Sequence, residues 1–448
     1  MKRNSGVITW RTQLRAAAIL AAAFAAVASL GNLAHADSRL LPQDQAQRLG
    51  LKRAWFTQVH LDRARNHVER AILADGHLTV LTSAGMIQEI DAQTGETLWF
   101  AQIGNEDYPS LGPSASEQFI ALVNGSTLYV LDRTDGRPVL SRRVGGAPGA
   151  APALATKFAF VPLVNGRIEG YPLEDKKKLT PWYYQSQGRT MVAPLATPKS
   201  IVWTTESGFL YVGDSDNPKM RFRLETGSEI MAPPSYLKPF VYVASASGEL
   251  FAMDEMTGKR RWKYATGFPV TRAAAPVGKR VFVTSEEPAL HCVEAETGNM
   301  QWEAPNVSQF AAASKDRVYG VDDLGALVVL DGAKGTMIGR LATNRMLRSL
   351  VNDQTDRIFL VSNDGMIECL HEAASKQPMQ HNPKAAEEKK AEGEQPAAAG
   401  AAPAAAPVKS DEKSAPPADE PKKADAPAVK EKPAGEFGVP ETDNPFGN

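Results

Sequence analysis

The chain has 448 residues, of which 43% are hydrophobic, so it can bury a sizeable core, and its length alone suggests two or three domains. Its formal net charge of -1 gives no overall attraction to nucleic acid or to anionic membranes. These values exclude a strongly basic nucleic-acid-binding protein.

The N-terminus carries the pattern of a secretory signal peptide. A basic stretch, Met1–Arg15, precedes the apolar run Ala16–Leu30, and the motif AHA that ends at Ala36 fits a cleavage site before Asp37. The apolar run is shorter than the roughly twenty residues of a membrane span, although an uncleaved membrane anchor is the alternative. Cleavage before Asp37 would remove the apolar run, so we expect no transmembrane span in the mature chain. No cysteine lies near Asp37, so we also expect no lipidated N-terminus.

The rest of the chain up to about residue 370 repeats itself roughly every 40 residues. Each copy ends a short apolar strand at one position, named the index residue, and a branched aliphatic residue precedes it by four places. The index residues are Asp91, Asp132, Pro172, Asp214, Asp254, Glu294, Asp331 and His371. This regularity indicates an internal repeat.

Each copy contains the elements of four short strands. A glycine before the index residue, such as Gly208, fits a tight hairpin turn. After the index residue, turns such as DAQTG and DEMTG lead to a new strand that often contains a tryptophan, for example Trp262. Because such units must stack to bury their faces, the sequence predicts an all-β fold, an eight-bladed β-propeller. Seven blades is the alternative if the third copy proves degenerate.

The last copy lacks its fourth strand. The segment AWFTQVH (Ala54–His60) resembles the fourth strand of the first copy, LWFAQIG (Leu98–Gly104), but has no strands of its own before it. We therefore predict that this N-terminal strand joins the last blade and closes the ring, which also hides strand edges. On this prediction residues 37–52 are a lead-in and residues 53–372 form the propeller.

The two cysteines of the chain, Cys292 and Cys369, occupy the same position in the sixth and eighth copies. A disulfide requires Cα atoms within about 7 Å of each other, which non-adjacent blades cannot offer. We expect two buried free thiols and no disulfide.

The repeat resembles that of the quinoprotein-type (PQQ-like) β-propeller family. The clearest copies are FAMDEMTGKRRW (Phe251–Trp262), IQEIDAQTGETLW (Ile87–Trp99) and LHCVEAETGNMQW (Leu290–Trp302). One group in this family, the PQQ-dependent dehydrogenases, holds the quinone and Ca²⁺ and often carries a disulfide between adjacent cysteines. Another group, the BamB-type scaffolds of outer-membrane assembly, has eight blades and no cofactor. This chain has no adjacent cysteines and no long insertions, so the resemblance implies a scaffold without a cofactor.

The strongest deviation from the repeat is the segment EDKKKLTPWYYQSQGR (Glu174–Arg189). It replaces the usual turn by three lysines followed by aromatic residues, a combination typical of interfaces. The candidate partner-binding rim consists of Lys176, Lys177, Lys178, Trp182, Tyr183 and Tyr184. The alternative is that Trp182 replaces the repeated tryptophan two places late and packs between blades.

No other pattern in the sequence favours catalysis or metal binding. The histidines have no metal-ligand spacing, and the acidic stretch after Asp214 lacks the glycine of a Ca²⁺ loop. The cationic stretch GKRRWK (Gly258–Lys263) fits an exposed outer strand better than a nucleic-acid site. We predict no catalytic, metal-binding or cofactor-binding residues and no nucleic-acid partner.

Residues 373–448 differ sharply in composition, being rich in Ala, Pro, Lys and Glu. Such a segment is predicted to be disordered because it buries too little apolar surface to offset the entropy of ordering. Its end, Glu436–Asn448, regains some hydrophobicity and is either a docking peptide or without function.

The sequence thus predicts an exported, non-enzymatic, monomeric propeller that binds protein partners in the cell envelope. The resemblance implies that the outer-membrane assembly machinery is among these partners. The alternatives are a PQQ-dependent dehydrogenase and a propeller that binds an envelope polysaccharide or another ligand.

Overall fold

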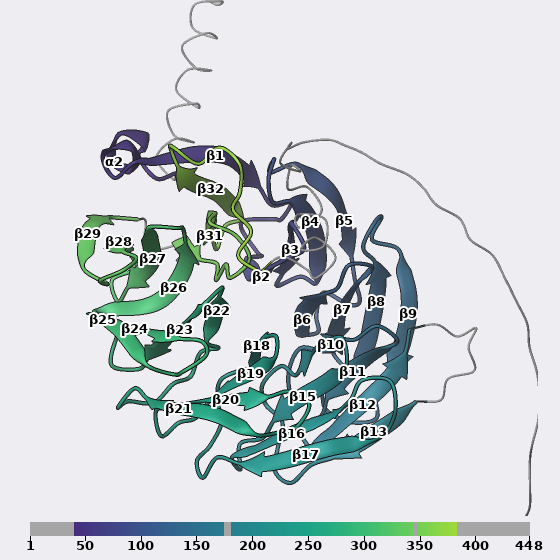
Figure 1. Cartoon of the computed structure of the whole chain (residues 1–448). Helices are drawn as coiled ribbons and strands as arrows, with labels where there is room; N and C mark the ends of the chain where they lie inside the picture. The colour runs from purple at the N-terminus through teal and green to yellow at the C-terminus, as the bar shows by residue number, and fades with distance from the viewer. Residues whose placement is uncertain (1–39, 174–180, 344–346, 383–448) are drawn as a thin grey trace, which may run out of the picture. The chain divides into compact units, whose positions relative to one another are not determined.

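The chain forms a ring of eight four-stranded antiparallel sheets, the blades of a β-propeller (Figure 1). The computed structural model describes residues 40–173, 181–343 and 347–382. In each blade the strands are named A to D from the centre of the ring to its rim. The prediction of an all-β, eight-bladed propeller is confirmed, and the alternative of seven blades is wrong. Residues 1–39, 174–180, 344–346 and 383–448, which include the predicted signal peptide and most of the predicted tail, lie outside the described residues.

The first four blades follow the chain in order. Blade 1 consists of β2 (Val68–Ala74), β3 (His77–Thr82), β4 (Met86–Asp91) and β5 (Thr97–Gln102). Blade 2 consists of β6 (Ser110–Ala115), β7 (Phe119–Asn124), β8 (Thr127–Asp132) and β9 (Pro138–Arg143). Blade 3 consists of β10 (Ala153–Leu154), β11 (Phe158–Pro162), β12 (Arg167–Pro172) and β13 (Trp182–Gln185). Blade 4 consists of β14 (Leu195–Ala196), β15 (Ser200–Thr204), β16 (Phe209–Asp214) and β17 (Met220–Glu225).

The next three blades repeat this plan, and the eighth takes its rim strand from the N-terminus. Blade 5 consists of β18 (Ser235–Leu237), β19 (Phe240–Ala244), β20 (Glu249–Asp254) and β21 (Arg260–Ala265). Blade 6 consists of β22 (Ala275–Val277), β23 (Arg280–Ser285), β24 (Ala289–Glu294) and β25 (Met300–Pro305). Blade 7 consists of β26 (Val307–Ala313), β27 (Arg317–Asp322), β28 (Leu327–Asp331) and β29 (Met337–Leu341). Blade 8 consists of β30 (Leu347–Ser349), β31 (Ile358–Ser362), β32 (Met366–Glu372) and β1 (Leu51–Gln58).

The N-terminal strand closes the ring, as predicted. Strand β1 pairs antiparallel with β32 along its whole length, from Leu51 opposite Glu372 to Gln58 opposite Met366. A buried ion pair supports this closure, with Arg53 Nε 2.9 Å from a carboxylate oxygen of Glu368. The strand therefore joins the two ends of the repeat region through backbone pairing and through a buried charge pair.

The lead-in before β1 also packs against the ring. It contains the short helix α2 (Gln43–Arg48), and Leu49 follows it. In the rim strand of blade 7, Gly339 stands opposite Val329, where five other blades carry a tryptophan, and the Leu49 side chain lies directly against Gly339. The N-terminal segment thus fills the place that the missing side chain leaves in blade 7.

The repeated turn after strand C explains the sequence pattern. The Asp254 carboxylate accepts hydrogen bonds from the backbone N–H groups of Met256 and Thr257, so it shapes the turn that leads to the rim strand. In four blades a rim-strand tryptophan then docks on the equivalent turn of the next blade: these are Trp55, Trp99, Trp262 and Trp302. Trp262 Nε1, for example, donates to the carbonyl oxygen of Ala295 at 2.9 Å and lies against Gly298.

The apolar core lies between neighbouring blades. Trp302 of blade 6 is buried together with Val328 and Leu330 of blade 7, and every neighbouring pair of blades shares a cluster of this kind. Cys292 and Cys369 are buried in two different clusters as free thiols. Burial raises the pKa of both thiols to about 12, so both stay protonated at neutral pH. Within the described ranges, no helix has the length and hydropathy needed to cross a membrane.

Candidate functional site

The antiparallel order of the strands gives the ring two faces. The turns between strands A and B and between strands C and D lie at one face, named the A–B face. The turns between strands B and C, and the connections from strand D to strand A of the next blade, lie at the opposite D–A face. Propellers bind partners with such loops because a rigid scaffold positions them.

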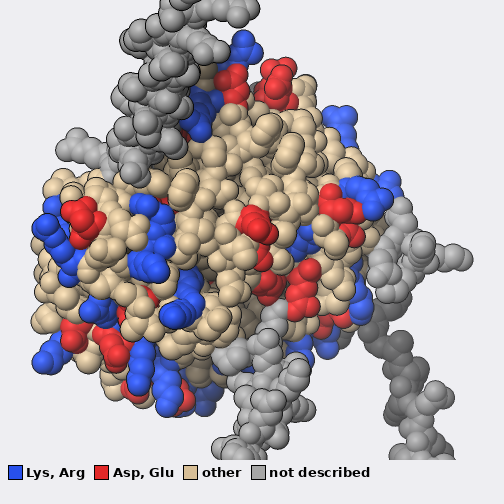
Figure 2. Space-filling model, turned by 90° about the horizontal axis from the view of Figure 1, so that it is seen from above, with Lys and Arg blue, Asp and Glu red and all other residues tan. Residues whose placement is uncertain are grey.

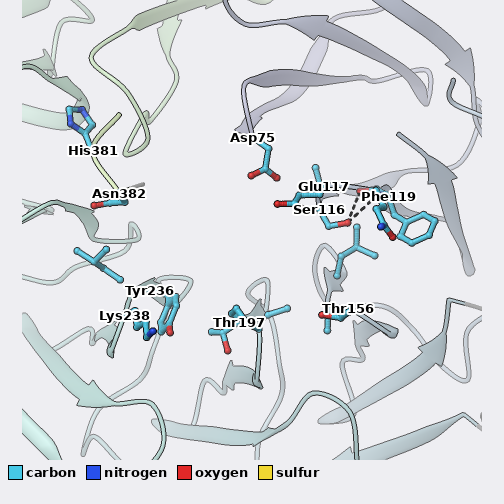
Figure 3. A pocket seen from close by; sticks show the side chains of 17 residues that line it. Asp75, Ser116, Glu117, Phe119, Thr156, Thr197, Tyr236, Lys238, His381 and Asn382 are labelled. Atoms are coloured by element: carbon cyan, nitrogen blue, oxygen red, sulfur yellow. Dashed lines mark hydrogen bonds between the residues drawn. The ribbon is translucent and has the colours of Figure 1, made fainter. Parts of the chain in front are cut away.

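The A–B face has a cavity of about 960 Å³ at the centre of the ring. The A–B turns of blades 1 to 5 line it, together with His381 and Asn382 from the C-terminal segment. Figure 3 shows these side chains around an open centre, with Asp75 and Glu117 on one side and His381 and Asn382 on another. Apolar side chains such as Leu154 and Leu237 line this cavity together with hydroxyl, amide and charged groups, so it offers a ligand both apolar contacts and hydrogen bonds.

Two buried carboxylates stabilise the joints between blades beside this cavity. Glu89 of blade 1 lies 2.8 Å from Nε of Arg133 in blade 2, and both side chains are almost fully buried. Glu255 accepts hydrogen bonds from the hydroxyl groups of Ser200 at 2.6 Å and Tyr236 at 2.8 Å, which joins blades 4 and 5. Burial and the hydrogen bond to Glu255 raise the pKa of Tyr236, so this phenol stays protonated and donates. Both carboxylates are thus engaged within the fold.

The segment 373–382 crosses the A–B face after the last blade. The His381 backbone N–H donates to the carbonyl of Gln354, and Asn382 bonds to the A–B turn of blade 6 through the Gly278 N–H and the Pro276 carbonyl. Burial lowers the pKa of His381, so its imidazole is neutral at neutral pH. The chain therefore reaches the rim of the central cavity before residue 383.

The D–A face carries loops that are fixed in the same way from blade to blade. In each of three successive D–A connections, one carbonyl accepts a hydrogen bond from the neighbouring B–C turn. The accepting carbonyls belong to Arg189, Glu229 and Pro269. The N–H groups that donate to them belong to Glu206, Ala246 and Glu286, respectively. The following residue is buried in each case: Thr190, Ile230 and Val270. These connections are therefore rigid.

The same three connections expose large apolar side chains. Met191 is 47% exposed, Met231 is 46% exposed and Phe268 is 47% exposed. Met191 and Met231 occupy equivalent places, each directly after the buried residue of its loop. Methionine and aromatic side chains held at the tips of fixed loops are typical of protein-binding surfaces. These three residues are named the D–A apolar set.

Comparison with protein families identifies the repeat region. The family model for the outer membrane protein assembly factor BamB matches residues 1–264 and 248–355. The chain belongs to the BamB family. No curated protein matches the sequence.

Solved structures show the same fold as this BamB-family chain. BamB from Moraxella catarrhalis has a TM-score of 0.58 and 17% identity, with 72% of this chain and 99% of that chain covered. The computationally designed Ika8 protein has a TM-score of 0.55 and 14% identity, with 70% and 98% covered. The C-terminal WD40 domain of Sif2 has a TM-score of 0.54 and 9% identity, with 72% and 98% covered. At these identities the likeness concerns the propeller fold alone.

The structure separates the predicted rim residues of this BamB-family propeller. Trp182 lies edge-on to Phe158 and Phe160, with ring centres 5.4 and 5.3 Å away. Tyr184 is buried, and its hydroxyl lies 2.9 Å from the carbonyl oxygens of both Asn217 and Lys219 in blade 4. Trp182 therefore packs within blade 3, and Tyr184 packs between blades 3 and 4.

The third aromatic residue of the rim, Tyr183, is exposed to solvent. Its side chain is 53% exposed, and the Arg167 guanidinium lies 4.5 Å from the ring centre. Lys176, Lys177 and Lys178, like the predicted cleavage site at Ala36 and Asp37, lie outside the described residues. Among the described residues of the candidate partner-binding rim, Tyr183 is therefore the one large side chain that is exposed.

Sequence reasoning missed the D–A apolar set and the placement of His381 and Asn382. Alignment of the D–A connections on their buried residue would have placed Met191 and Met231 in equivalent positions. Residues 373–382 were grouped with the Ala-, Pro-, Lys- and Glu-rich tail, although they contain Met379 and His381, residue types that do not occur after them.

Proposed function

We propose that this protein is an exported, non-enzymatic and monomeric scaffold of the cell envelope, which binds protein partners of outer-membrane assembly. Membership of the BamB family supports the coarse assignment. The signal-peptide pattern before Asp37 supports export.

The observation that carries the proposal is the D–A apolar set. Met191, Met231 and Phe268 project from three successive connections whose backbones are pinned to neighbouring turns. Because these loops are already fixed, little of their conformational entropy is lost when a partner covers the three side chains. The apolar surface that becomes buried then contributes to affinity. We therefore assign partner docking to the three connections that lead into blades 4, 5 and 6, and to the D–A face around these connections.

Affinity capture from envelope extracts tests this assignment. The full chain, affinity-tagged and expressed in a cell that exports it, is compared with a variant carrying Met191→Ser, Met231→Ser and Phe268→Ser. We expect at least about tenfold less captured outer-membrane assembly protein, since loss of interface residues worth about 1.4 kcal/mol gives this factor.

The matched control is Met256→Ser. Met256 is 49% exposed but lies in the C–D turn of blade 5, at the opposite face. Equal capture by the triple variant and the wild-type protein, or an equal loss in the control, would contradict the assignment to the D–A face.

The alternative of a PQQ-dependent dehydrogenase does not fit the central cavity. PQQ is a tricarboxylate, whereas the described lining carries the carboxylates Asp75 and Glu117 and, as its sole Lys or Arg, Lys238. We expect that PQQ with Ca²⁺ neither raises the unfolding temperature of the purified protein nor supports dye reduction. Stabilisation together with dye reduction would establish the enzyme instead of the scaffold.

A further inference from the structure

The rim strands of the blades differ in charge. The D strand of each blade is the outer edge of its sheet, and charged side chains on such strands discourage pairing with other chains. The charged residues are Lys52 and Arg53 on β1, Arg142 and Arg143 on β9, Arg221, Arg223 and Glu225 on β17, Arg260, Arg261 and Lys263 on β21, Glu303 on β25, and Arg340 on β29. Strands β5 and β13 carry no charged residue. On β13, however, the Arg167 guanidinium lies over the exposed Tyr183 ring.

Strand β5, with the sequence TLWFAQ, is therefore the rim strand without a charge on it or over its exposed ring. Leu98 is 50% exposed and Phe100 is 53% exposed. Trp99, between them, points to blade 2, where its Nε1 donates to the Arg133 carbonyl at 2.7 Å. A β-bulge interrupts the pairing of β5 with β4 at Leu98, but the same bulge occurs in most other rim strands and does not distinguish β5.

The Phe100 ring is held in place although it is exposed. It stacks on the His60 imidazole with ring centres 4.7 Å apart. The His60 backbone N–H donates to the side-chain oxygen of Gln88 at 2.7 Å, and Gln88 stands opposite Phe100 in the sheet. Because its position is fixed before any partner arrives, this ring loses little rotamer entropy on binding.

The outer side of β5 is a free sheet edge within the described residues. The order of the sheet is β2-β3-β4-β5, so no described strand pairs with that side. Figure 2 looks from above Figure 1, toward the part of the rim where β1 and β5 lie. It shows a broad area without charged side chains between groups of Lys, Arg, Asp and Glu. An uncharged edge with exposed apolar side chains is a template for adding another strand.

We propose that the outer edge of β5 binds an extended, uncharged segment of a client polypeptide as a fifth strand of blade 1. The occupant must carry apolar side chains at alternate positions to lie beside Leu98 and Phe100, and a charge at those positions would be desolvated without a partner. The sequences that form the strands of outer-membrane barrels have this alternation, and they are available for pairing before the barrel folds. The identity of the client rests on the proposed function, whereas the strand-binding edge does not.

The test uses the purified full chain and a fluorescent peptide of about ten residues that alternates Leu or Val with Thr, the length of one barrel strand. Binding is measured by fluorescence anisotropy. We expect Phe100→Lys to weaken binding at least about tenfold, since lysine on an edge blocks strand addition. The matched control is Val139→Lys, because Val139 is 46% exposed on β9, which already carries Arg142 and Arg143; this variant should bind like the wild-type protein.

A second probe keeps the test independent of folding. The same peptide with every backbone amide methylated retains its side chains but cannot donate a hydrogen bond from either edge, and we expect it not to bind the wild-type protein. Equal binding of the methylated peptide, or unchanged binding to a folded Phe100→Lys variant, would overturn the proposal. The variant that lacks the D–A apolar set should bind the peptide normally, so failure at β5 leaves the scaffold proposal standing.

Discussion

Trp55 Nε1 donates a hydrogen bond to the carbonyl oxygen of Ala92 at 3.1 Å, so the first strand of the propeller is tied to the next blade in the ring. The Trp55 ring also lies against Gly95 in the same turn. This is the arrangement that Trp262 and Trp302 make elsewhere, and here it joins the two ends of the repeat region. The seam of the ring is therefore built like its other blade contacts.

Replacing Trp55 should open this seam. Trp55 is 9% exposed, so Trp55→Ala leaves a cavity between blades 8 and 1 and removes the bond to Ala92. We expect a loss of about 3–5 kcal/mol in the free energy of unfolding, measured by urea denaturation. The neighbouring change Phe56→Ala is the control, since Phe56 is 57% exposed and should cost within about 0.5 kcal/mol. Similar losses of unfolding free energy in both variants would show that Trp55 stabilises the protein no more than an exposed residue does.

The turn glycines separate backbone strain from packing. Gly136 has a φ of 74°, and a Cβ there would collide with the Trp99 ring, whereas Gly76 has a φ of 78° and open space around it. Gly76→Ala should therefore show the strain of a positive φ alone, about 1 kcal/mol. Gly136→Ala should cost clearly more, because the Trp99 ring must also move. Thermal unfolding of both variants measures the difference, and equal costs would argue against a packing role for the glycine.

The repeat could be predicted from the sequence because its determinants are local. The turn after Asp254 is set by hydrogen bonds from Met256 and Thr257, and Gly298 and Trp262 lie at fixed distances along the chain from their index residues. Closure by β1 was predictable for the same reason, since one copy lacked a strand and the N-terminus supplied its pattern.

The inter-blade role of Tyr184 depends on tertiary geometry. Trp182 stands opposite Gly170, in the register of the repeated tryptophan, but Tyr184 makes the contact with the next blade. The path of residues 373–382 rests on backbone and amide hydrogen bonds, which leave no trace in composition or hydrophobic periodicity. The exposure of Met191 and Met231 likewise follows from the pinned backbone and not from their residue type.

The turn aspartates should make stability depend on pH in the acid range. The hydrogen bonds from the Thr257 hydroxyl and backbone N–H hold the pKa of Asp254 below its ordinary value of 3.8. The unfolded chain therefore binds more protons than the folded protein between these two pKa values, and stability falls as the pH falls through this range. Above the ordinary value the contribution is fully present.

The variant Asp254→Asn tests this dependence. It should be less stable than the wild-type protein at pH 6, and the difference should shrink as the pH falls below about 4. Urea unfolding midpoints between pH 6 and pH 2.5 measure both curves. A difference that stays constant over this range would mean that the Asp254 carboxylate has no lowered pKa.

Asn382 should hold the C-terminal segment at the central cavity without supporting the ring. Its side-chain oxygen accepts from the Gly278 N–H at 3.0 Å, and its amide donates to the carbonyl oxygens of Pro276 and Asp353. Asn382→Ala removes all three bonds, so we expect amide hydrogen exchange at His381, whose N–H donates to Gln354, to accelerate roughly tenfold. The unfolding midpoint of the propeller should not change, because these bonds join surface turns. Gln380→Ala is the control at an exposed neighbouring position, and equal exchange in the two variants would show that the segment is held by its backbone alone.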